Sequence, residues 1–224
     1  MQNMKIIVTK DMEEKLATRP LYEQAFDDPK GFVDYYYDEK MKDNTVVICK
    51  DGERIVSMLH LNPYTIAVNG REASVYYIVA VATDKAYRRQ GCMRKVLKAA
   101  FDEMIKEEIP FCFLLPVDES IYRDFGFETI CAFFARGDAR STLPYEAVQR
   151  EYDVYAVRDA LYEKRKRMED VLAGAGDTEL LPANPVIMAK IIHTKACAQL
   201  FGIKDDDGLP EYLKTKRCFF REEV

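Results

Sequence analysis

Six basic side chains and no acidic ones lie within residues 85–98, in a chain whose net charge is −5. They are Lys85, Arg88, Arg89, Arg94, Lys95 and Lys98. Gly91 lies among them, directly before an amphipathic segment. A helix start offers unpaired N–H groups and partial positive charge, glycine lets an anion come close, and arginine adds charge-assisted hydrogen bonds. The stretch therefore predicts a phosphate-binding loop, and a solvated basic helix face is the alternative.

The elements on either side of this loop support the prediction. Residues 71–83 are nearly continuous in apolar side chains from Val75 to Ala82, which predicts a central strand buried on both faces. After Gly91 the apolar residues recur at steps of three and one from Met93 to Ile105, which predicts an amphipathic helix. A strand, a basic turn and a helix start are the parts that a phosphate site needs.

The remaining pattern alternates between sheet and helix. Asn69-Gly70 is a strong hairpin signal, and Asp118 is a candidate N-cap. Strands are expected at 5–10, 45–50, 54–61, 64–68, 71–83, 110–117 and 127–136. Helices are expected at 12–26, 30–41 and 92–105, with a turn and a short helix within 118–127. This order predicts an α/β or α+β domain over residues 1–136.

The pattern of expected elements changes after residue 136, and residues 137–224 are expected to form a C-terminal extension. Residues 143–174 predict one long helix. Residues 186–192 and 216–224 then read as strands, with a short helix over 193–202 that stops at Gly202.

Composition narrows the class of protein. Apolar residues make up 48% and charged residues 32%, as in an ordinary globular protein. No apolar run approaches the roughly 20 residues of a membrane span, and no secretion signal is recognisable. The six cysteines are scattered without a CxxC pair, which indicates a reducing cytoplasm, no disulfide frame and no zinc site. The acidic balance argues against a nucleic-acid partner.

The stretch "VAVATDKAYRRQGCMRKVL" resembles motif A of the GCN5-related N-acetyltransferases (GNAT), [RQ]-x-x-G-x-[GA]. Arg88, Gly91 and Met93 occupy the marked positions, and Met93 departs from the small residue expected there. A large apolar residue after the glycine resembles the Eis-type (enhanced intracellular survival) branch, as does the later "SIYRDFGFE". The resemblance implies the GNAT fold, a mixed central sheet flanked by helices.

By this resemblance the chain is an acyltransferase whose cosubstrate is acetyl-coenzyme A (acetyl-CoA). Val81, Ala82 and Thr83 would offer strand backbone groups to the pantetheine and the acetyl carbonyl. The residues around Gly91 would cradle the pyrophosphate; they are Arg88, Arg89, Gln90, Gly91, Cys92, Met93 and Arg94. Cys92 is not expected to act as a nucleophile, because a thioester is already activated for direct transfer.

The resemblance also implies two catalytic groups. Tyr122 would protonate, or donate a hydrogen bond to, the departing thiolate, although a packed aromatic role is the alternative. In Eis-type enzymes the C-terminal carboxylate enters the active site, and here that group belongs to Val224. The only histidines are His60 and His193, and His60 is more readily a core residue than a base.

The tail resembles a reduced sterol-carrier-like segment, with "IMAKIIHTKACAQLFG" as its opening and "RCFFREEV" as its final strand. The acceptor is expected to be a primary amine of a small molecule. A cationic amine would suit the acids at 27, 28, 34, 38 and 39, which could equally be solvated. Two other functions stay open: a non-catalytic acyl-CoA sensor, and an apolar-ligand carrier using the tail. The long helix from Tyr145 could be the interface of a homo-oligomer.

Overall fold

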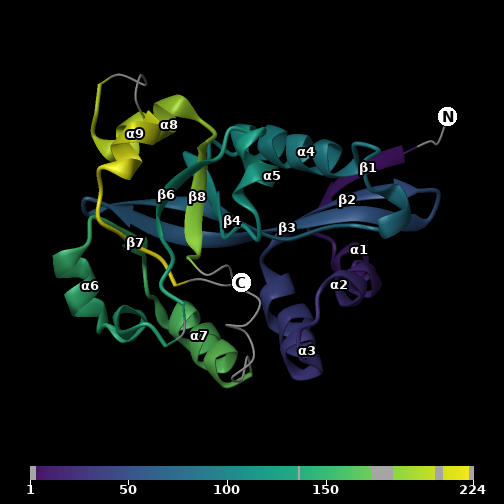
Figure 1. The fold of residues 1–224 in the computed structure, drawn as a ribbon, viewed down its shortest axis with the longest axis horizontal. Helices are drawn as coiled ribbons and strands as arrows, with labels where there is room; N and C mark the ends of the chain where they lie inside the picture. Colours follow the sequence, from purple (N-terminus) through teal and green to yellow (C-terminus); the bar gives the residue numbers. More distant parts are fainter. Residues whose placement is uncertain (1–3, 136, 173–183, 205–208, 222–224) are drawn as a thin grey trace. The chain divides into compact units, whose positions relative to one another are not determined.

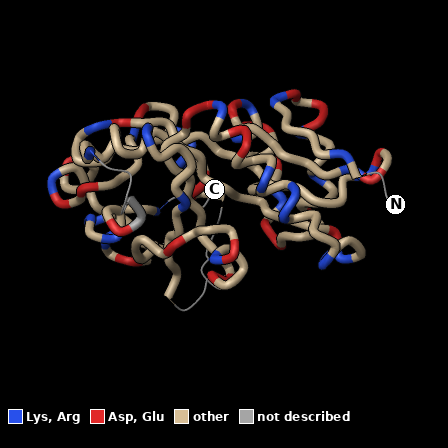
Figure 2. Tube along the Cα trace, turned by 90° about the horizontal axis from the view of Figure 1, so that it is seen from above, with Lys and Arg blue, Asp and Glu red and all other residues tan. Residues whose placement is uncertain are grey.

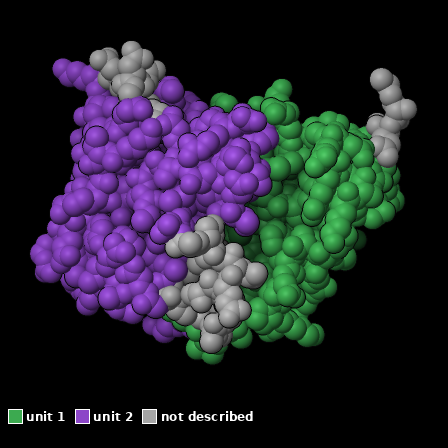
Figure 3. Space-filling model, viewed as in Figure 1, with its two compact units in different colours: residues 1–63, 78–107, 168–173 green, residues 64–77, 108–167, 174–224 purple. Residues whose placement is uncertain are grey.

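The computed structural model describes residues 4–135, 137–172, 184–204 and 209–221. Within these residues the strands form one mixed sheet, in the order β1-β2-β3-β4-β5-β8-β6, with β7 beside β3 and β9 beside β7 (Figure 1). Helices flank the sheet, so the expected α+β architecture is confirmed. The chain separates into two compact units, Met1–Pro63 with Ile78–Glu107 and Met168–Ala173, and Tyr64–Tyr77 with Glu108–Arg167 and Gly174–Val224 (Figure 3).

The first unit carries the N-terminal strands and the basic loop. Its elements are β1 (Met4–Thr9), α1 (Met12–Leu16), α2 (Arg19–Ala25), α3 (Lys30–Glu39), η1 (Lys40–Lys42), β2 (Thr45–Asp51), part of β3 (Arg54–Val68), part of β4 (Arg71–Thr83), η2 (Lys85–Tyr87) and α4 (Cys92–Lys106). Within this unit, α4 packs on β1 and β2, and α1 to α3 lie on the other side of these strands (Figure 1). The predicted helix after Gly91 is confirmed.

The expected single helix over 12–26 is wrong. The structure has two helices, α1 and α2, separated at Ala17 and Thr18. Pro20 lies in the first turn of α2, where its missing N–H costs nothing, whereas inside a longer helix it would remove a hydrogen bond and clash with the preceding turn. The helix expected at 30–41 is confirmed as α3, and its tyrosines Tyr35, Tyr36 and Tyr37 are buried.

The hairpin predicted at Asn69-Gly70 is confirmed, with φ values of 48° and 76°. Both residues have positive φ, as a type I′ turn requires. The two strands expected at 54–61 and 64–68 are one continuous strand, β3, that runs through Pro63. Another feature was not expected: Ala80, inside β4, has φ 54°, a left-handed conformation that is uncommon for alanine and interrupts the regular strand.

The second unit holds the other strands and the remaining helices. Its elements are β5 (Phe111–Leu114), α5 (Glu119–Arg123), β6 (Glu128–Ala132), η3 (Ala139–Thr142), α6 (Tyr145–Glu151), β7 (Val154–Ala156), most of α7 (Ala160–Leu172), β8 (Val186–Ile191), α8 (Thr194–Phe201), α9 (Leu209–Lys214) and β9 (Cys218–Phe219). Asp118 caps α5 as predicted, because its side chain accepts a hydrogen bond from the Ser120 N–H. α8 ends at Gly202 with φ 73°, also as predicted.

The long helix expected over 143–174 is wrong, because the segment contains α6, β7 and α7. Residues 152–156 combine valine and tyrosine, which favour strands, and β7 pairs with β3 on one side and with β9 on the other. Asp159 then accepts a hydrogen bond from the Tyr162 N–H at 2.7 Å, which starts α7. Sheet pairing therefore overrides the helical spacing of the sequence.

Strand β8, from the expected extension, is inserted between β5 and β6 and pairs antiparallel with both. The domain boundary expected at residue 136 stays a prediction. Strands β4 and β5 are parallel, with Tyr76 opposite Cys112 and Tyr77 opposite Phe113. This pairing makes the sheet mixed.

Candidate active site

The end of β4 leads into the basic loop. The Ala82 carbonyl accepts a hydrogen bond from the Ser57 hydroxyl at 3.0 Å, and the Thr83 carbonyl accepts one from Arg88 Nε at 3.2 Å. Ala80 lies just before this segment, and its positive φ changes the direction of the backbone there. Strain of this kind persists only where the surrounding structure enforces it, so the end of β4 is held in a defined shape.

Asp84 anchors the start of the loop. Its side chain accepts hydrogen bonds from the Ala86 N–H at 2.8 Å and from the Arg54 guanidinium at 2.5 Å. These donors hold the pKa of Asp84 below its usual value, the Ala86 N–H most of all. The Tyr87 hydroxyl donates to Asp51 at 2.9 Å. The loop is thus tied to the β2–β3 hairpin before the exposed turn begins.

The turn itself adopts a left-handed conformation twice before α4 begins. Arg89 has φ 61°, and Gly91, the N-cap of α4, has φ 79°. Both residues are exposed, as are Arg88 and Gln90. The first N–H groups of α4 therefore follow directly on an exposed, basic turn. In the chain as a whole, basic and acidic residues are interspersed along the trace (Figure 2), so this uninterrupted basic stretch is a local feature.

Gly91 is needed for its conformation rather than for space. A Cβ built at this position would meet no protein atom within 4 Å. Gly91→Ala should lower the free energy of unfolding by about 1 kcal/mol, because L-residues are strained at this φ. Gly70→Ala is the matched control, since Gly70 has φ 76° and equally open surroundings in the β3–β4 hairpin, outside the basic loop. Chemical denaturation of both variants measures the stability loss. Only Gly91→Ala should also weaken acetyl-CoA binding, and equal binding by the two variants would contradict the site.

The Cys92 side chain points inward and is 1% exposed, with its Sγ 3.5 Å from Met4 Sδ. Met93 is half-buried in the same first turn. A phosphate at the helix start would therefore meet the backbone N–H of Cys92 and not its thiol.

Tyr122 lies in α5, in the second compact unit. Its ring packs edge-on against Phe127, with centroids 5.8 Å apart. Burial raises the pKa of Tyr122 to about 12. The phenol therefore stays protonated at neutral pH and can donate a hydrogen bond, whereas complete proton transfer to a thiolate becomes less favourable. Val224 lies outside the described residues.

Neither histidine has the surroundings of a solvent-facing base. His60 is fully buried, and its Nδ1 lies 3.0 Å from the Tyr36 hydroxyl. Burial, with a smaller contribution from the charge of Lys15, lowers the pKa of His60 to about 3. His193 is the N-cap of α8, where its Nδ1 accepts a hydrogen bond from the Ala196 N–H at 3.1 Å.

The buried His60 should make the fold sensitive to acid. Its folded-state pKa lies below the ordinary value of about 6.5, so the unfolded chain binds the proton first as the pH falls. Stability should therefore decline below pH 6.5 by up to about 1.4 kcal/mol per pH unit, or about 2 kcal/mol by pH 5. Urea unfolding between pH 7.5 and 5 measures this loss in the wild type and in His60→Gln. The same slope in both proteins would show that His60 is not its source.

The acids considered for a cationic acceptor are partly engaged. Asp34 pairs with Arg19 at 2.5 Å and with Lys30 at 2.7 Å. Asp28 accepts a hydrogen bond from the Tyr22 hydroxyl at 2.7 Å. These contacts favour a structural role for both carboxylates.

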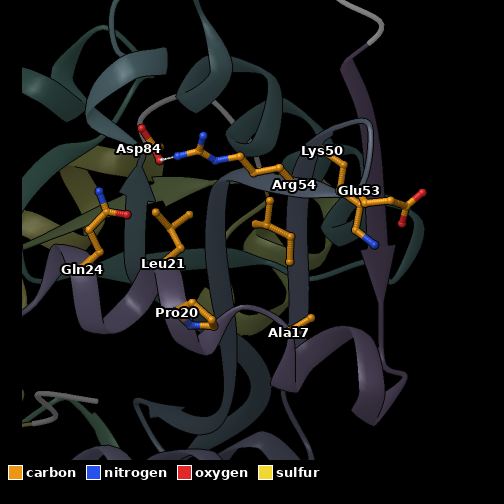
Figure 4. A pocket seen from close by; sticks show the side chains of 9 residues that line it. Ala17, Pro20, Leu21, Gln24, Lys50, Glu53, Arg54 and Asp84 are labelled. Atoms are coloured by element: carbon orange, nitrogen blue, oxygen red, sulfur yellow. Dashed lines mark hydrogen bonds and ion pairs between the residues drawn. The ribbon is translucent and has the colours of Figure 1, made fainter.

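Sequence reasoning did not foresee a pocket of about 310 Å³ in the first unit (Figure 4). One side comes from α2 and from Ala17 just before it, and the charged side comes from the β2–β3 hairpin and Asp84. The lining residues are Ala17, Pro20, Leu21, Gln24, Lys50, Glu53, Arg54, Ile55 and Asp84. Figure 4 shows Arg54 extending along the pocket to Asp84, so the ion pair that anchors the basic loop also forms its wall. Because these residues come from segments far apart in the sequence, no local signal announces them.

Two kinds of feature are not found in the residues that the structure describes. No helix there is long and apolar enough to cross a membrane. No group of three or more His, Cys, Asp or Glu side chains arranged to hold a metal ion is found in that part of the chain.

Solved structures with a similar fold include three that are described as acyltransferases. A probable N-acyltransferase from Enterococcus faecalis V583 has a TM-score of 0.60 at 13% identity, covering 87% of this chain and 74% of its own. A GNAT family N-acetyltransferase from Escherichia coli, solved in complex with CoA, has a TM-score of 0.56 at 15% identity, with coverages of 91% and 88%. A GCN5-related N-acetyltransferase from Kribbella flavida has a TM-score of 0.56 at 12% identity, with coverages of 87% and 73%. At these identities the likeness shows the fold.

The family is shown by the sequence itself. Residues 8–130 match a family profile described as an acetyltransferase (GNAT) domain. No curated protein matches the chain significantly. The matched region contains β4, the basic loop, α4 and Tyr122. Because it spans more than half of the 224 residues, the chain belongs to the GNAT family of acetyltransferases and is an acyltransferase.

Proposed function

We propose that this acetyltransferase moves the acetyl group of acetyl-CoA directly to the primary amine of a small acceptor. The observation that carries the proposal is the exposed turn Arg88–Gly91, with two left-handed residues and the start of a fifteen-residue helix behind it. This geometry presents backbone N–H groups and partial positive charge to an anion. The CoA bound to the similar Escherichia coli enzyme is a ligand with such phosphates.

The residues predicted from the sequence take two roles in this proposal. The backbone of Val81, Ala82 and Thr83 lies alongside the pantetheine and the acetyl group. Two of its carbonyls already accept hydrogen bonds from Ser57 and Arg88, which leaves Val81 as the best candidate among the three for a direct contact. The second group cradles the pyrophosphate: Arg88, Arg89, Gln90, Gly91, Cys92, Met93 and Arg94.

In the reaction the amine nitrogen attacks the thioester carbonyl carbon, and a tetrahedral intermediate forms. Its collapse breaks the C–S bond and releases the CoA thiolate. Tyr122 donates a hydrogen bond to this thiolate, which takes a proton from the phenol or from water. The amine gives up its own proton to water or to a base that the described residues do not identify. Because the pKa of Tyr122 is raised, its phenol stays protonated and is suited to donating a hydrogen bond rather than to acting as a base.

Within the family we place the chain in the Eis-type branch. The arginine-rich loop with Met93 after the glycine supports this placement, as does "SIYRDFGFE" around Tyr122. The similar Enterococcus faecalis protein, described as a probable N-acyltransferase, also covers most of this chain. The resemblance of the tail to a sterol-carrier-like segment belongs to the same proposal.

A turnover screen separates the enzyme from an acyl-CoA sensor. The purified chain is incubated with acetyl-CoA and a panel of amines, including polyamines, amino acids and aminoglycosides, and free CoA thiol is measured. The enzyme should release thiol in step with an acetylated amine for at least one class. A protein that binds acetyl-CoA but acetylates nothing across the panel would instead favour the sensor.

A further inference from the structure

Cys92, in the first turn of α4, lies close to two other sulfur-bearing side chains on the buried side of the helix. Cys92 Sγ lies 3.5 Å from Met4 Sδ, and the Cys92 thiol is within hydrogen-bonding reach of Cys49. Cys49 is fully buried and Cys92 is 1% exposed. All three residues belong to the same compact unit.

The register of the β1–β2 pair places Met4 and Cys49 on the same face of the sheet. In the antiparallel β1–β2 pair, Met4 lies opposite Asp51 and Ile6 lies opposite Cys49. Met4 and Cys49 therefore point to the same face, because directly opposed residues share a face and alternate residues repeat it. Helix α4 packs on both strands and brings Cys92 to that face.

We propose that Met4, Cys49 and Cys92 form a three-coordinate site for a soft monovalent ion, Cu(I). Thiolate and thioether sulfurs are the ligands that select this ion. Metal–sulfur bonds of about 2.3 Å in a trigonal arrangement would place the sulfurs about 4 Å apart. The printed separation of 3.5 Å between Cys92 Sγ and Met4 Sδ is within a small side-chain adjustment of that value.

The charges near the trio favour a monovalent ion. Two thiolates and one Cu(I) carry a net charge of −1, which is costly to bury without compensation. The N-terminus of α4 supplies partial positive charge, and Lys95 Nζ lies 3.8 Å from Met4 Sδ. A structural zinc ion would require a fourth ligand, and no group of three or more His, Cys, Asp or Glu ligands is found in the described residues.

The binding step balances in protons and charge. Burial raises the pKa of the Cys49 thiol to about 11, so this cysteine is protonated in the metal-free protein. Binding forms two Cu–thiolate bonds and one Cu–thioether bond, and each cysteine that starts as a thiol releases its proton to solvent. No change of oxidation state is involved. The site lies behind the turn and uses the buried Cys92 thiol, whereas the proposed phosphate contact uses the Cys92 backbone N–H.

The test is an anaerobic titration of the reduced full chain with the Cu(I)–bathocuproine disulfonate complex. The wild type should withdraw one Cu(I) per chain from the chelator. Loss of a residue that only supports a metal ligand typically weakens metal affinity by roughly 10–100-fold. Cys49→Ala and Cys92→Ala each remove a ligand, so each should weaken Cu(I) uptake by more than this. Met4→Leu should weaken Cu(I) uptake by about tenfold. Cys197→Ala is the matched control, because Cys197 is an equally buried thiol in α8, in the other unit.

Two results would overturn the site: no uptake by the wild type, or uptake that Cys49→Ala and Cys92→Ala leave unchanged. If a cysteine variant fails to fold, X-ray absorption of the copper-loaded wild type identifies the atoms bound to copper without any substitution. Three sulfur neighbours at one short distance support the site, whereas nitrogen or oxygen neighbours contradict it.

Discussion

Tyr122→Phe should reduce kcat by about 100-fold or more, in the range typical for loss of a positioned proton donor, while acetyl-CoA binding stays unchanged. The substitution removes only the hydroxyl and keeps the ring that packs on Phe127. Without the hydroxyl, the departing thiolate loses its hydrogen-bond donor, and the barrier to C–S cleavage rises. Steady-state turnover with an accepted amine, together with calorimetric titration of acetyl-CoA, measures the two quantities separately.

Tyr152→Phe is the matched control for this prediction. Tyr152 also packs its ring against phenylalanines, Phe134 and Phe219, and it lies in the same unit as Tyr122. Its kcat should equal that of the wild type. If Tyr122→Phe keeps kcat within a factor of two, the phenol has no part in the reaction. A loss of kcat that comes with a lower melting temperature would indicate a packing role instead.

The raised pKa of Tyr122 also predicts how kcat depends on pH, which the wild type and Tyr122→Phe can test together. Because the phenol ionises only near pH 12, the donor is present throughout the neutral and mildly alkaline range. The pH profile of kcat should therefore show no alkaline decline from Tyr122 below about pH 11. A wild-type decline at lower alkaline pH that disappears in Tyr122→Phe would contradict the pKa assigned here.

Arg89→Gly should weaken acetyl-CoA binding and at the same time relieve backbone strain. Arg89 has φ 61° and is exposed, so glycine adopts the same conformation more readily. Loss of the guanidinium removes charge-assisted hydrogen bonds to phosphate, worth about 1.5–3 kcal/mol, so Kd should rise by about 10-fold to 150-fold. Affinity for acetyl-CoA should thus fall while the free energy of unfolding rises, a combination that a general loss of structure cannot produce.

Lys98→Ala is the control for charge alone. Lys98 is exposed and belongs to the same basic stretch, but it lies in the second turn of α4, beyond the first N–H groups. Its removal should change Kd by less than about threefold, and mainly at low salt, because exposed charges are screened. Equal losses for Arg89→Gly and Lys98→Ala would point to a diffuse basic surface rather than to a built phosphate site.

The elements around the basic loop could be predicted from the sequence, because the residues that define them are close together in the chain. The spacing of apolar residues after Gly91 defines α4, and Asn69-Gly70 defines the β3–β4 hairpin. Asp118 likewise defines the start of α5. Each of these depends on residues within one or two turns, where propensity and capping act.

The features that could not be predicted depend on contacts between distant segments. Ala80 has no local reason to adopt a left-handed conformation inside an apolar strand. The break of the 143–174 segment depends on the pairing of β7 with β3 and β9, and β8 finds its place between β5 and β6 only through the sheet. The pocket beside Arg54 and Asp84 is likewise assembled from three parts of the chain.

A crystal structure of the chain with acetyl-CoA tests the central claim most directly. We expect the pyrophosphate oxygens to lie about 2.7–3.2 Å from backbone nitrogens within residues 89–94, in front of the first turn of α4. A cofactor bound elsewhere, with this turn filled by its own side chains, would contradict the account.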